Sequence, residues 1–257
     1  MSDIFSIKGK TALITGGSRG LGLMMAKGFV RAGAKVYISS RKADVCQQAA
    51  EELSKEGTCM ALPADITSDE GIKELVDQLT RREEKLDILI NNAGKAWEAP
   101  LETFPDIGWD TVMNTNVKSL FKLTRGLLPL LESAGSAQNP ARVINIGSIA
   151  ADFNNGSTLI SYGASKSAAH WLTKTLAHEL GPRHITVNAI APGRFPSAMT
   201  APVMADKDRY AAEVAAIPLG RWGQEADIAG LSIFLASPSA AFITGAIIPL
   251  DGGTLLV

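Results

Sequence analysis

The sequence of 257 residues has little of what sites for metals and polyanions require. Its two cysteines, Cys46 and Cys59, form no CxxC motif, and two thiols alone cannot make a zinc site. The three histidines form no HExxH motif. With 25 Lys and Arg residues against 26 Asp and Glu residues, the net charge of −1 gives no broad positive field for nucleic acids or anionic membranes. We therefore expect no metal, no nucleic-acid partner and no membrane contact.

Long hydrophobic runs and flexible linkers are also missing. No stretch approaches the roughly 20 apolar residues of a membrane span, and Met1–Lys10 lacks the continuous apolar region of a signal peptide. No Pro-, Gly- or Ser-rich segment divides the chain, and no repeat of fixed period is present. We expect one domain over residues 1–257, located in the cytoplasm, where thiols stay reduced.

Short apolar runs alternate with longer amphipathic stretches along most of the chain. Continuous apolar runs suit strands that are buried on both faces, as in a parallel sheet. The predicted strands are Thr11–Thr15, Lys35–Ser39, Cys59–Pro63, Asp87–Asn91, Arg142–Gly147, Ile185–Ile190 and Ala246–Leu250, and the predicted helices lie near Arg19–Ala32, Ala43–Glu56, Ser68–Arg82, Gly108–Leu131, Ile160–Leu180 and Gln224–Ala236. This alternation predicts an α/β fold class, a doubly wound, Rossmann-like parallel sheet of seven strands with helices on both faces.

A glycine-rich turn follows the first predicted strand, with Gly16, Gly20 and Gly22 in a G-x3-G-x-G spacing. Glycines let the backbone turn sharply and approach a ligand, and the next helix offers unpaired N–H groups and its positive dipole end to a phosphate. The functional interpretation is a dinucleotide pyrophosphate site, and the alternative is a tight turn alone. Residues 16–20 also match GxSxG, the nucleophile elbow of serine hydrolases, so a serine hydrolase that uses this turn is kept as an alternative. The strands and oxyanion loop that such enzymes need upstream are missing.

The second predicted strand ends at Ser39, and Ser40 and Arg41 follow it. In dinucleotide-binding folds an acidic residue at this tip bonds the ribose 2′-hydroxyl, whereas an arginine accommodates a 2′-phosphate. Ser40 leaves the acidic position empty, and Arg41 and Arg19 can both reach this corner. The sequence therefore predicts NADP(H) rather than NAD(H). The alternative is that Arg41 only flanks the start of a solvated helix.

Tyr162 and Lys166 are four residues apart at the start of a predicted helix, so their side chains share one face. Tyrosine has an ordinary pKa of about 10, and a neighbouring ammonium lowers the pKa of the phenol toward the range of acid–base catalysis. Ser148 follows the fifth predicted strand, at the carboxyl edge of the sheet, where doubly wound sheets bind ligands. Its hydroxyl can hydrogen-bond a substrate carbonyl, although a turn or helix cap is the plainer role.

Together these features resemble the short-chain dehydrogenase/reductase family over nearly the whole chain. The matching positions are Thr15-Gly16-x3-Gly20-x-Gly22, Asp65, Asn91-Asn92-Ala93-Gly94, Asn116, Ser148, Tyr162-x3-Lys166 and Pro192-Gly193. The resemblance implies that Ser148, Tyr162, Lys166 and Asn116 are catalytic. It implies that Lys166 holds the nicotinamide ribose and lowers the pKa of Tyr162, and that Asn116 fixes a water between Lys166 and solvent.

The resemblance also implies which residues hold the coenzyme. Asp65 would accept a hydrogen bond from the adenine amino group, and Pro192-Gly193 would support the nicotinamide carboxamide. The implied set is Gly16, Ser18, Arg19, Gly20, Leu21, Gly22, Ser40, Arg41, Asp65, Ile66, Asn92, Ala93, Gly94, Tyr162, Lys166, Pro192, Gly193, Phe195 and Ser197. At Ser197 the family often has Thr, and the serine hydroxyl can make the same hydrogen bond.

Within the family, segments 141–148 and 190–196 are most similar to 3-oxoacyl-[acyl-carrier-protein] reductases, including the branch of rhamnolipid synthesis. The implied function is NADP(H)-dependent hydride transfer to a carbonyl, with a 3-oxoacyl thioester as substrate; sugar, steroid or small diol dehydrogenases and a non-catalytic regulator are the alternatives. Segment 192–223 is expected to be a substrate-binding lid, with Phe195, Met199, Val203, Met204 and Trp222 as apolar lining. The resemblance implies a homotetramer formed through the helices near 108–131 and 160–180.

Overall fold

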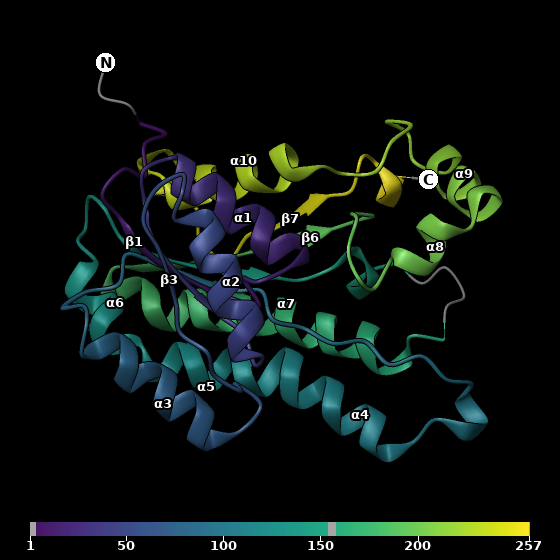
Figure 1. Cartoon of the computed structure of the whole chain (residues 1–257), viewed down its shortest axis with the longest axis horizontal. Helices are drawn as coiled ribbons and strands as arrows, with labels where there is room; N and C mark the ends of the chain where they lie inside the picture. The colour runs from purple at the N-terminus through teal and green to yellow at the C-terminus, as the bar shows by residue number, and fades with distance from the viewer. Residues whose placement is uncertain (1–3, 154–157, 257) are drawn as a thin grey trace.

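The computed structural model describes residues 4–153 and 158–256. Within these residues one sheet of seven parallel strands has the order β3-β2-β1-β4-β5-β6-β7. The strands are β1 (Thr11–Thr15), β2 (Lys35–Ser39), β3 (Cys59–Ala61), β4 (Ile88–Asn91), β5 (Ala141–Ile146), β6 (Ile185–Pro192) and β7 (Ile247–Leu250). The predicted doubly wound sheet is confirmed (Figure 1).

Helices cover both faces of this sheet (Figure 1). One face carries α1 (Gly20–Arg31), α2 (Ala43–Leu53) and α10 (Glu225–Ala236), and the other carries α3 (Asp69–Thr80), α4 (Asp106–Met113), α5 (Ser119–Gly126), α6 (Leu128–Ala134) and α7 (Ile160–Leu180). Alternate residues of β1 supply the two cores: Ala12 and Ile14 pack on the α1 side, and Leu13 packs on the α3 side. Both faces are therefore apolar, which explains the continuous runs in the sequence. Among the described residues no helix has the length and apolar character needed to cross a membrane.

The order of the strands reverses between β1 and β4. The chain builds outward from β1 to β3 and then returns to place β4 on the other side of β1. A reversal of this kind opens a crevice at the carboxyl ends of the strands, where doubly wound sheets bind their ligands. The residues that follow β1, β2, β4, β5 and β6 therefore meet along one edge of the sheet.

Several predicted boundaries differ from the structure. The helix predicted near 108–131 is divided into α4, a π-helical segment at Asn114–Lys118, α5 and α6. Pro129 in the first turn of α6 has no N–H with which to continue the preceding helix, so a new helix starts there. β3 ends at Ala61 rather than Pro63, and β6 extends to Pro192.

Segment 192–223, for which no helix is predicted from the sequence, contains two short helices, α8 (Ala201–Ala205) and α9 (Lys207–Ala215). Asp206 caps α9, since its carboxylate accepts a hydrogen bond from the Arg209 N–H at 3.0 Å. Val203, Ile217 and Trp222 form a small buried cluster within the segment, separate from the two main cores. The segment therefore has a core of its own.

Candidate active site at the carboxyl edge of the sheet

Ser148, Tyr162 and Lys166 lie together where β5 ends. Ser148 follows β5, and its hydroxyl accepts a hydrogen bond from the Ala150 N–H at 3.1 Å. Tyr162 and Lys166 stand in the first two turns of α7. Lys166 Nζ lies 5.6 Å from the centroid of the Tyr162 ring and donates to the Ile146 carbonyl oxygen at 2.7 Å. The structure thus brings the three predicted catalytic side chains to one place.

Burial governs the protonation of this group. Burial raises the pKa of Tyr162, while a hydrogen bond with Ser148 and the charge of Arg194 lower it, and the net direction is upward. Burial also lowers the pKa of Lys166 to about 8. Burial outweighs the groups that lower the pKa of Tyr162, which are Ser148 and Arg194. Tyr162 is consequently protonated at neutral pH and able to donate a proton. That Lys166 lowers this pKa when the coenzyme is bound stays a prediction.

Asn116 lies in the π-helical segment and is almost fully buried. Its Nδ2 donates to the Lys95 carbonyl oxygen and to Ser165 Oγ, each at 2.9 Å, and its Oδ1 accepts from the Lys95 N–H at 2.8 Å. A Cβ added to Gly94 would lie 3.4 Å from Asn116 Oδ1 and 3.7 Å from Lys166 Nζ. Asn116 and Lys166 therefore flank the same glycine, and the widened turn of the π segment is what places Asn116 there. A water held between them stays a prediction.

The glycine-rich turn leads from β1 into α1. Gly16 and Gly20 have positive φ angles of 64° and 53°, a region that favours glycine. A Cβ on Gly22 would lie 2.3 Å from the Gly16 carbonyl oxygen, so only glycine allows the helix to start so close to the turn. Asn92 Nδ2 donates to the Thr15 carbonyl oxygen at 2.8 Å and joins the turn to the end of β4. No acidic side chain stands in the first turn of α1, which leaves its positive end available to a phosphate.

The corner beside this turn carries polar groups without partners. The Ser39 hydroxyl is buried and has no hydrogen-bond partner among the described residues, and the buried Ser40 hydroxyl has only the Cys46 thiol beside it. Arg19 and Arg41 are exposed, and neither forms a hydrogen bond or an ion pair within residues 4–153 and 158–256. The predicted coenzyme corner thus combines buried hydroxyls with two uncommitted guanidinium groups.

Asp65 and Ile66 follow β3 at the same edge. Asp65 Oδ1 accepts hydrogen bonds from the Thr67 N–H at 3.0 Å and the Thr67 hydroxyl at 2.7 Å, so its second carboxylate oxygen remains for another donor. Burial raises the pKa of Asp65. The hydrogen bonds from Thr67 and the charge of Arg41 together outweigh burial, so the pKa of Asp65 lies below its ordinary value. Asp65 is therefore an ionised acceptor that lies near Arg41.

The residues after β6 turn back toward the glycine-rich turn. The Gly193 N–H donates to the Leu250 carbonyl oxygen at 3.0 Å, and a Cβ there would lie 2.8 Å from Asp251 Cα. Ser197 reaches the first turn, since a Cβ on Gly20 would lie 3.7 Å from Ser197 Cβ. Phe195, however, is buried in the core, with Gly223 against its ring. Its side chain is a packing residue, and only its backbone remains for a coenzyme.

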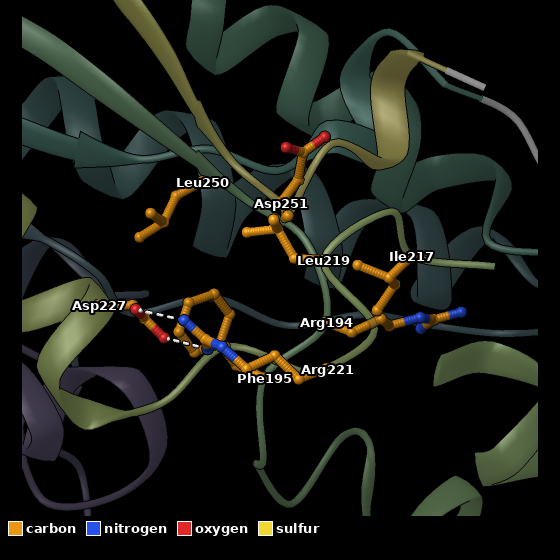
Figure 2. A pocket seen from close by; sticks show the side chains of 10 residues that line it. Arg194, Phe195, Ile217, Leu219, Arg221, Asp227, Leu250 and Asp251 are labelled. Atoms are coloured by element: carbon orange, nitrogen blue, oxygen red, sulfur yellow. Dashed lines mark hydrogen bonds and ion pairs between the residues drawn. The ribbon is translucent and has the colours of Figure 1, made fainter. Parts of the chain in front are cut away.

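A small cavity of about 60 Å³ that opens to solvent lies beside this segment (Figure 2). It is lined by Arg194, Phe195, Ile217, Leu219, Arg221 and Gly223 from the two ends of segment 192–223, by Asp227 in α10, by Leu250 at the end of β7 and by Asp251 and Gly252 after it. Ser148, Tyr162 and Lys166 are not among its lining residues. The cavity is therefore a chamber next to the catalytic side chains rather than the place where they meet.

Known proteins resemble the chain along nearly its whole length. A family model described as Enoyl-(Acyl carrier protein) reductase matches residues 16–254. The Rhamnolipids biosynthesis 3-oxoacyl-[acyl-carrier-protein] reductase of Pseudomonas aeruginosa is 49% identical over 253 residues, which are 98% of this chain and 99% of that protein. The chain belongs to the short-chain dehydrogenase/reductase family. A similar solved structure is the active-site complex of Pseudomonas aeruginosa RhlG with NADP. Its match to this chain has a TM-score of 0.96 and 49% sequence identity and covers 99% of both chains.

Other members of the short-chain dehydrogenase/reductase family act on different compounds. The 2-dehydro-3-deoxy-D-gluconate 5-dehydrogenase of Bacillus subtilis is 38% identical over 257 residues, 99% of this chain and 98% of that protein. Membership in the family confirms the predicted oxidoreductase class. The serine-hydrolase alternative is wrong, because residues 16–20 form the first strand-to-helix turn of a dinucleotide-type sheet rather than a nucleophile elbow.

Sequence reasoning missed the polar network that supports this family site. Asn91 Nδ2 donates to Asn145 Oδ1 and Asn145 Nδ2 donates to Thr173 Oγ1, each at 2.9 Å, so buried amides join the ends of β4 and β5 to α7. Ser165 Oγ adds a bond to the Tyr162 carbonyl oxygen at 2.7 Å. Two asparagines inside apolar strand runs were the available signal, because a buried amide needs partners. The charge of Arg194 beside Tyr162 had no sequence signal.

Proposed function

We propose that this short-chain dehydrogenase/reductase is an NADP(H)-dependent oxidoreductase that reduces 3-oxoacyl thioesters. The observation that carries the proposal is the grouping of Ser148, Tyr162 and Lys166 at the carboxyl edge of the sheet, in a chain 49% identical to a 3-oxoacyl-[acyl-carrier-protein] reductase. That relative matches over 98% of this chain, so the whole site and the substrate segment are covered.

The chain supplies acid catalysis and orientation. NADPH, when bound, supplies the hydride for the carbonyl carbon. Ser148 donates a hydrogen bond to the carbonyl oxygen and fixes its position, and Tyr162 donates the proton to the same oxygen. The raised pKa of Tyr162 keeps the phenol protonated, which suits the reducing direction. Lys166 and Asn116, on either side of Gly94, hold the ribose side of the site and conduct the replacement proton.

The empty hydrogen-bonding capacity of the coenzyme corner fits a 2′-phosphorylated dinucleotide. Arg19, Arg41 and the Ser39 and Ser40 hydroxyls would hold the 2′-phosphate, since these groups have few or no partners among the described residues. Asp65 and Ile66 would flank the adenine, and the turn from Gly16 to Gly22, with Ser18 and Leu21, would hold the pyrophosphate. Asn92, Ala93, Gly94, Pro192, Gly193, the Phe195 backbone and Ser197 would line the nicotinamide side.

Segment 192–223 is proposed to cover the substrate. Of the five apolar residues expected to line it, Phe195, Val203 and Trp222 are buried in cores, whereas Met199 is 51% exposed and Met204 is 45% exposed. The two methionines are therefore the apolar surface that the segment offers to an acyl chain. Methionine suits this role because its flexible side chain adapts to ligands of different length.

The similarity to the Bacillus subtilis 2-dehydro-3-deoxy-D-gluconate 5-dehydrogenase supports a second candidate, an oxidoreductase of sugar acids. A substrate panel separates the two. We expect NADPH-dependent reduction of acetoacetyl-coenzyme A with kcat/KM well above that for 5-keto-gluconate or a short diketone. Reduction of the keto acid without reduction of the thioester would overturn the first proposal and support the second.

We also propose a homotetramer in the cytoplasm. Large aromatic side chains are exposed on neighbouring helices of one face, with Trp171 on α7 at 72%, Trp109 on α4 at 41% and Phe121 on α5 at 39%. A second copy of the chain would cover these side chains, because exposed apolar patches of this kind mark protein interfaces. Light scattering of the wild type should give four times the 27.1 kDa chain mass, and Trp171→Glu should reduce it. A monomeric wild type would refute the assembly.

A further inference from the structure

Arg194 lies near the start of segment 192–223, where the segment leaves the carboxyl edge of the sheet. It follows Gly193 directly, and its carbonyl oxygen accepts a hydrogen bond from the Gly223 N–H at 2.9 Å. The two ends of the segment are therefore joined at this residue. Gly193 itself packs against Asp251 without room for a Cβ, so the backbone that carries Arg194 has little freedom.

The side chain of Arg194 is held from one side by α9. Its Nε lies 3.0 Å from Glu213 Oε2 in an ion pair. Glu213 shares a helix face with Tyr210 and Val214, and Tyr210 packs on Trp222 with 4.9 Å between ring centroids. The small core of the segment thus fixes the carboxylate, and the carboxylate fixes the guanidinium.

The rest of the Arg194 guanidinium is uncommitted. The side chain is 34% exposed, and no residue in the described part of the chain accepts a hydrogen bond from it. Arg221 on the same cavity differs, since its two terminal nitrogens donate to Asp227 at 2.7 and 3.0 Å, as Figure 2 shows. The terminal nitrogens of Arg221 are thus both bonded, whereas those of Arg194 remain for a ligand.

Arg194 also lies on the side of the sheet where the reaction takes place. It follows the end of β6, and Ser148 follows the end of β5, the strand that pairs with β6 in parallel. In agreement with this position, the charge of Arg194 lowers the pKa of Tyr162. Tyr162 protonates one oxygen of the substrate. A second donor close to Tyr162 can therefore bind another oxygen of the same substrate. Glu213 pairs with Arg194 at 3.0 Å and with Arg209 at 3.8 Å, so it offsets part of the positive charge at this site. A guanidinium whose charge is partly offset can still donate a hydrogen bond to a neutral carbonyl oxygen.

We propose that Arg194 is a specificity-determining residue whose guanidinium donates a hydrogen bond to the thioester carbonyl oxygen of a 3-oxoacyl thioester, while the keto oxygen lies at Ser148 and Tyr162. This inference rests on the proposed function. It explains how the enzyme separates 3-oxo thioesters from simple ketones, which have no second oxygen. A bond to a charged donor changes binding by about 10- to 100-fold when the acceptor is removed.

The test compares two substrates that differ only in that oxygen: acetoacetyl-coenzyme A, and its thioether analogue with a methylene in place of the thioester carbonyl. Arg194→Met should lower kcat/KM for acetoacetyl-coenzyme A by about 10- to 100-fold and for the thioether by less than about threefold. Arg194→Lys should recover part of the loss, because an ammonium still donates. Glu213→Gln should give a smaller loss with the same dependence on substrate. Lys207→Met, which removes an exposed cation from the same helix, is the matched control and should change neither value.

Two results overturn the inference and are distinguishable. Equal losses of Arg194→Met on both substrates would show that Arg194 supports the fold or the chemistry without contacting the second oxygen, and the proposed function would stand. A wild type that reduces neither thioester nor thioether, but reduces a keto acid, would overturn the inference and the proposed function together.

Discussion

Arg41 offers a direct test of coenzyme choice. Its guanidinium is exposed and has no ion pair to break, so a 2′-phosphate would add a charge-assisted hydrogen bond without the loss of another. Such a bond contributes about 1.5–3 kcal/mol, and about 1.4 kcal/mol is a tenfold change in affinity. Because the group is solvated and screened by salt, we expect the lower end of this range, so Arg41→Ala should lower kcat/KM for NADPH by about tenfold.

The same substitution should leave NADH nearly unaffected, because NADH has no 2′-phosphate. Arg41 also lowers the pKa of Asp65, but the two hydrogen bonds from Thr67 persist in the variant, so Asp65 stays ionised at neutral pH. Steady-state kinetics with both coenzymes at ~0.1 M and ~1 M salt measure the effect, and the NADPH preference should shrink at high salt. Lys42→Ala, one exposed cation further on, is the control. A wild type that prefers NADH, or an Arg41→Ala variant with an unchanged ratio of kcat/KM for the two coenzymes, would refute the reasoning.

Adding Ser40→Asp to Arg41→Ala should turn the coenzyme preference toward NADH, since the carboxylate can bond the ribose hydroxyl and repels phosphate.

Three further predictions concern the catalytic group and the turn. Tyr162→Phe should lower kcat by about 10²- to 10⁴-fold with unchanged coenzyme binding by fluorescence titration; a variant of near-normal kcat would remove Tyr162 as the acid. Burial lowers the pKa of Lys166 from 10.5 to about 8, so the unfolded chain binds more protons between these values and stability rises with pH there. Urea unfolding across this window should show the wild type gaining about 1–3 kcal/mol more than Lys166→Met, and parallel curves would contradict the shift. Gly22→Ala, whose Cβ would lie 2.3 Å from the Gly16 carbonyl oxygen, should cost about 1–3 kcal/mol in the free energy of unfolding. Gly230→Ala, in open space on α10, should instead stabilise by about 0.5–1 kcal/mol, and equal effects at the two sites would refute the packing argument.

Local chemistry in the sequence determined the fold class and the centre of the site. The short apolar runs of β1, β2 and β4 are typical of strands buried on both faces, so the alternation with helices predicts a parallel sheet. The turn at Gly16–Gly22 and the four-residue spacing of Tyr162 and Lys166 are equally local, because positive φ angles and helix periodicity depend on a few neighbouring residues. Each of these features was visible before any tertiary contact was known.

Tertiary packing decided what depends on distant segments. Tyr162 has a raised rather than a lowered pKa, because the residues packed around it partly bury the phenol, and the spacing to Lys166 contains no information on burial. Phe195 is a buried core residue whose side chain also borders the cavity of Figure 2, because Gly223 from the other end of the segment packs on its ring. Asn116 reaches its partners only through a π turn that no local pattern marks.

The charges show the same division. Arg194 and Arg221 are both arginines of segment 192–223, and nothing in the neighbouring residues tells which one is committed. Only the folded chain brings Asp227 to the terminal nitrogens of Arg221 and Glu213 to the Nε of Arg194. The terminal nitrogens of Arg194 are therefore available to a ligand. The residue types in the sequence determined the kind of chemistry. The tertiary structure decided which side chains are in place to perform it, because burial and charge act through space between residues that are distant in the sequence.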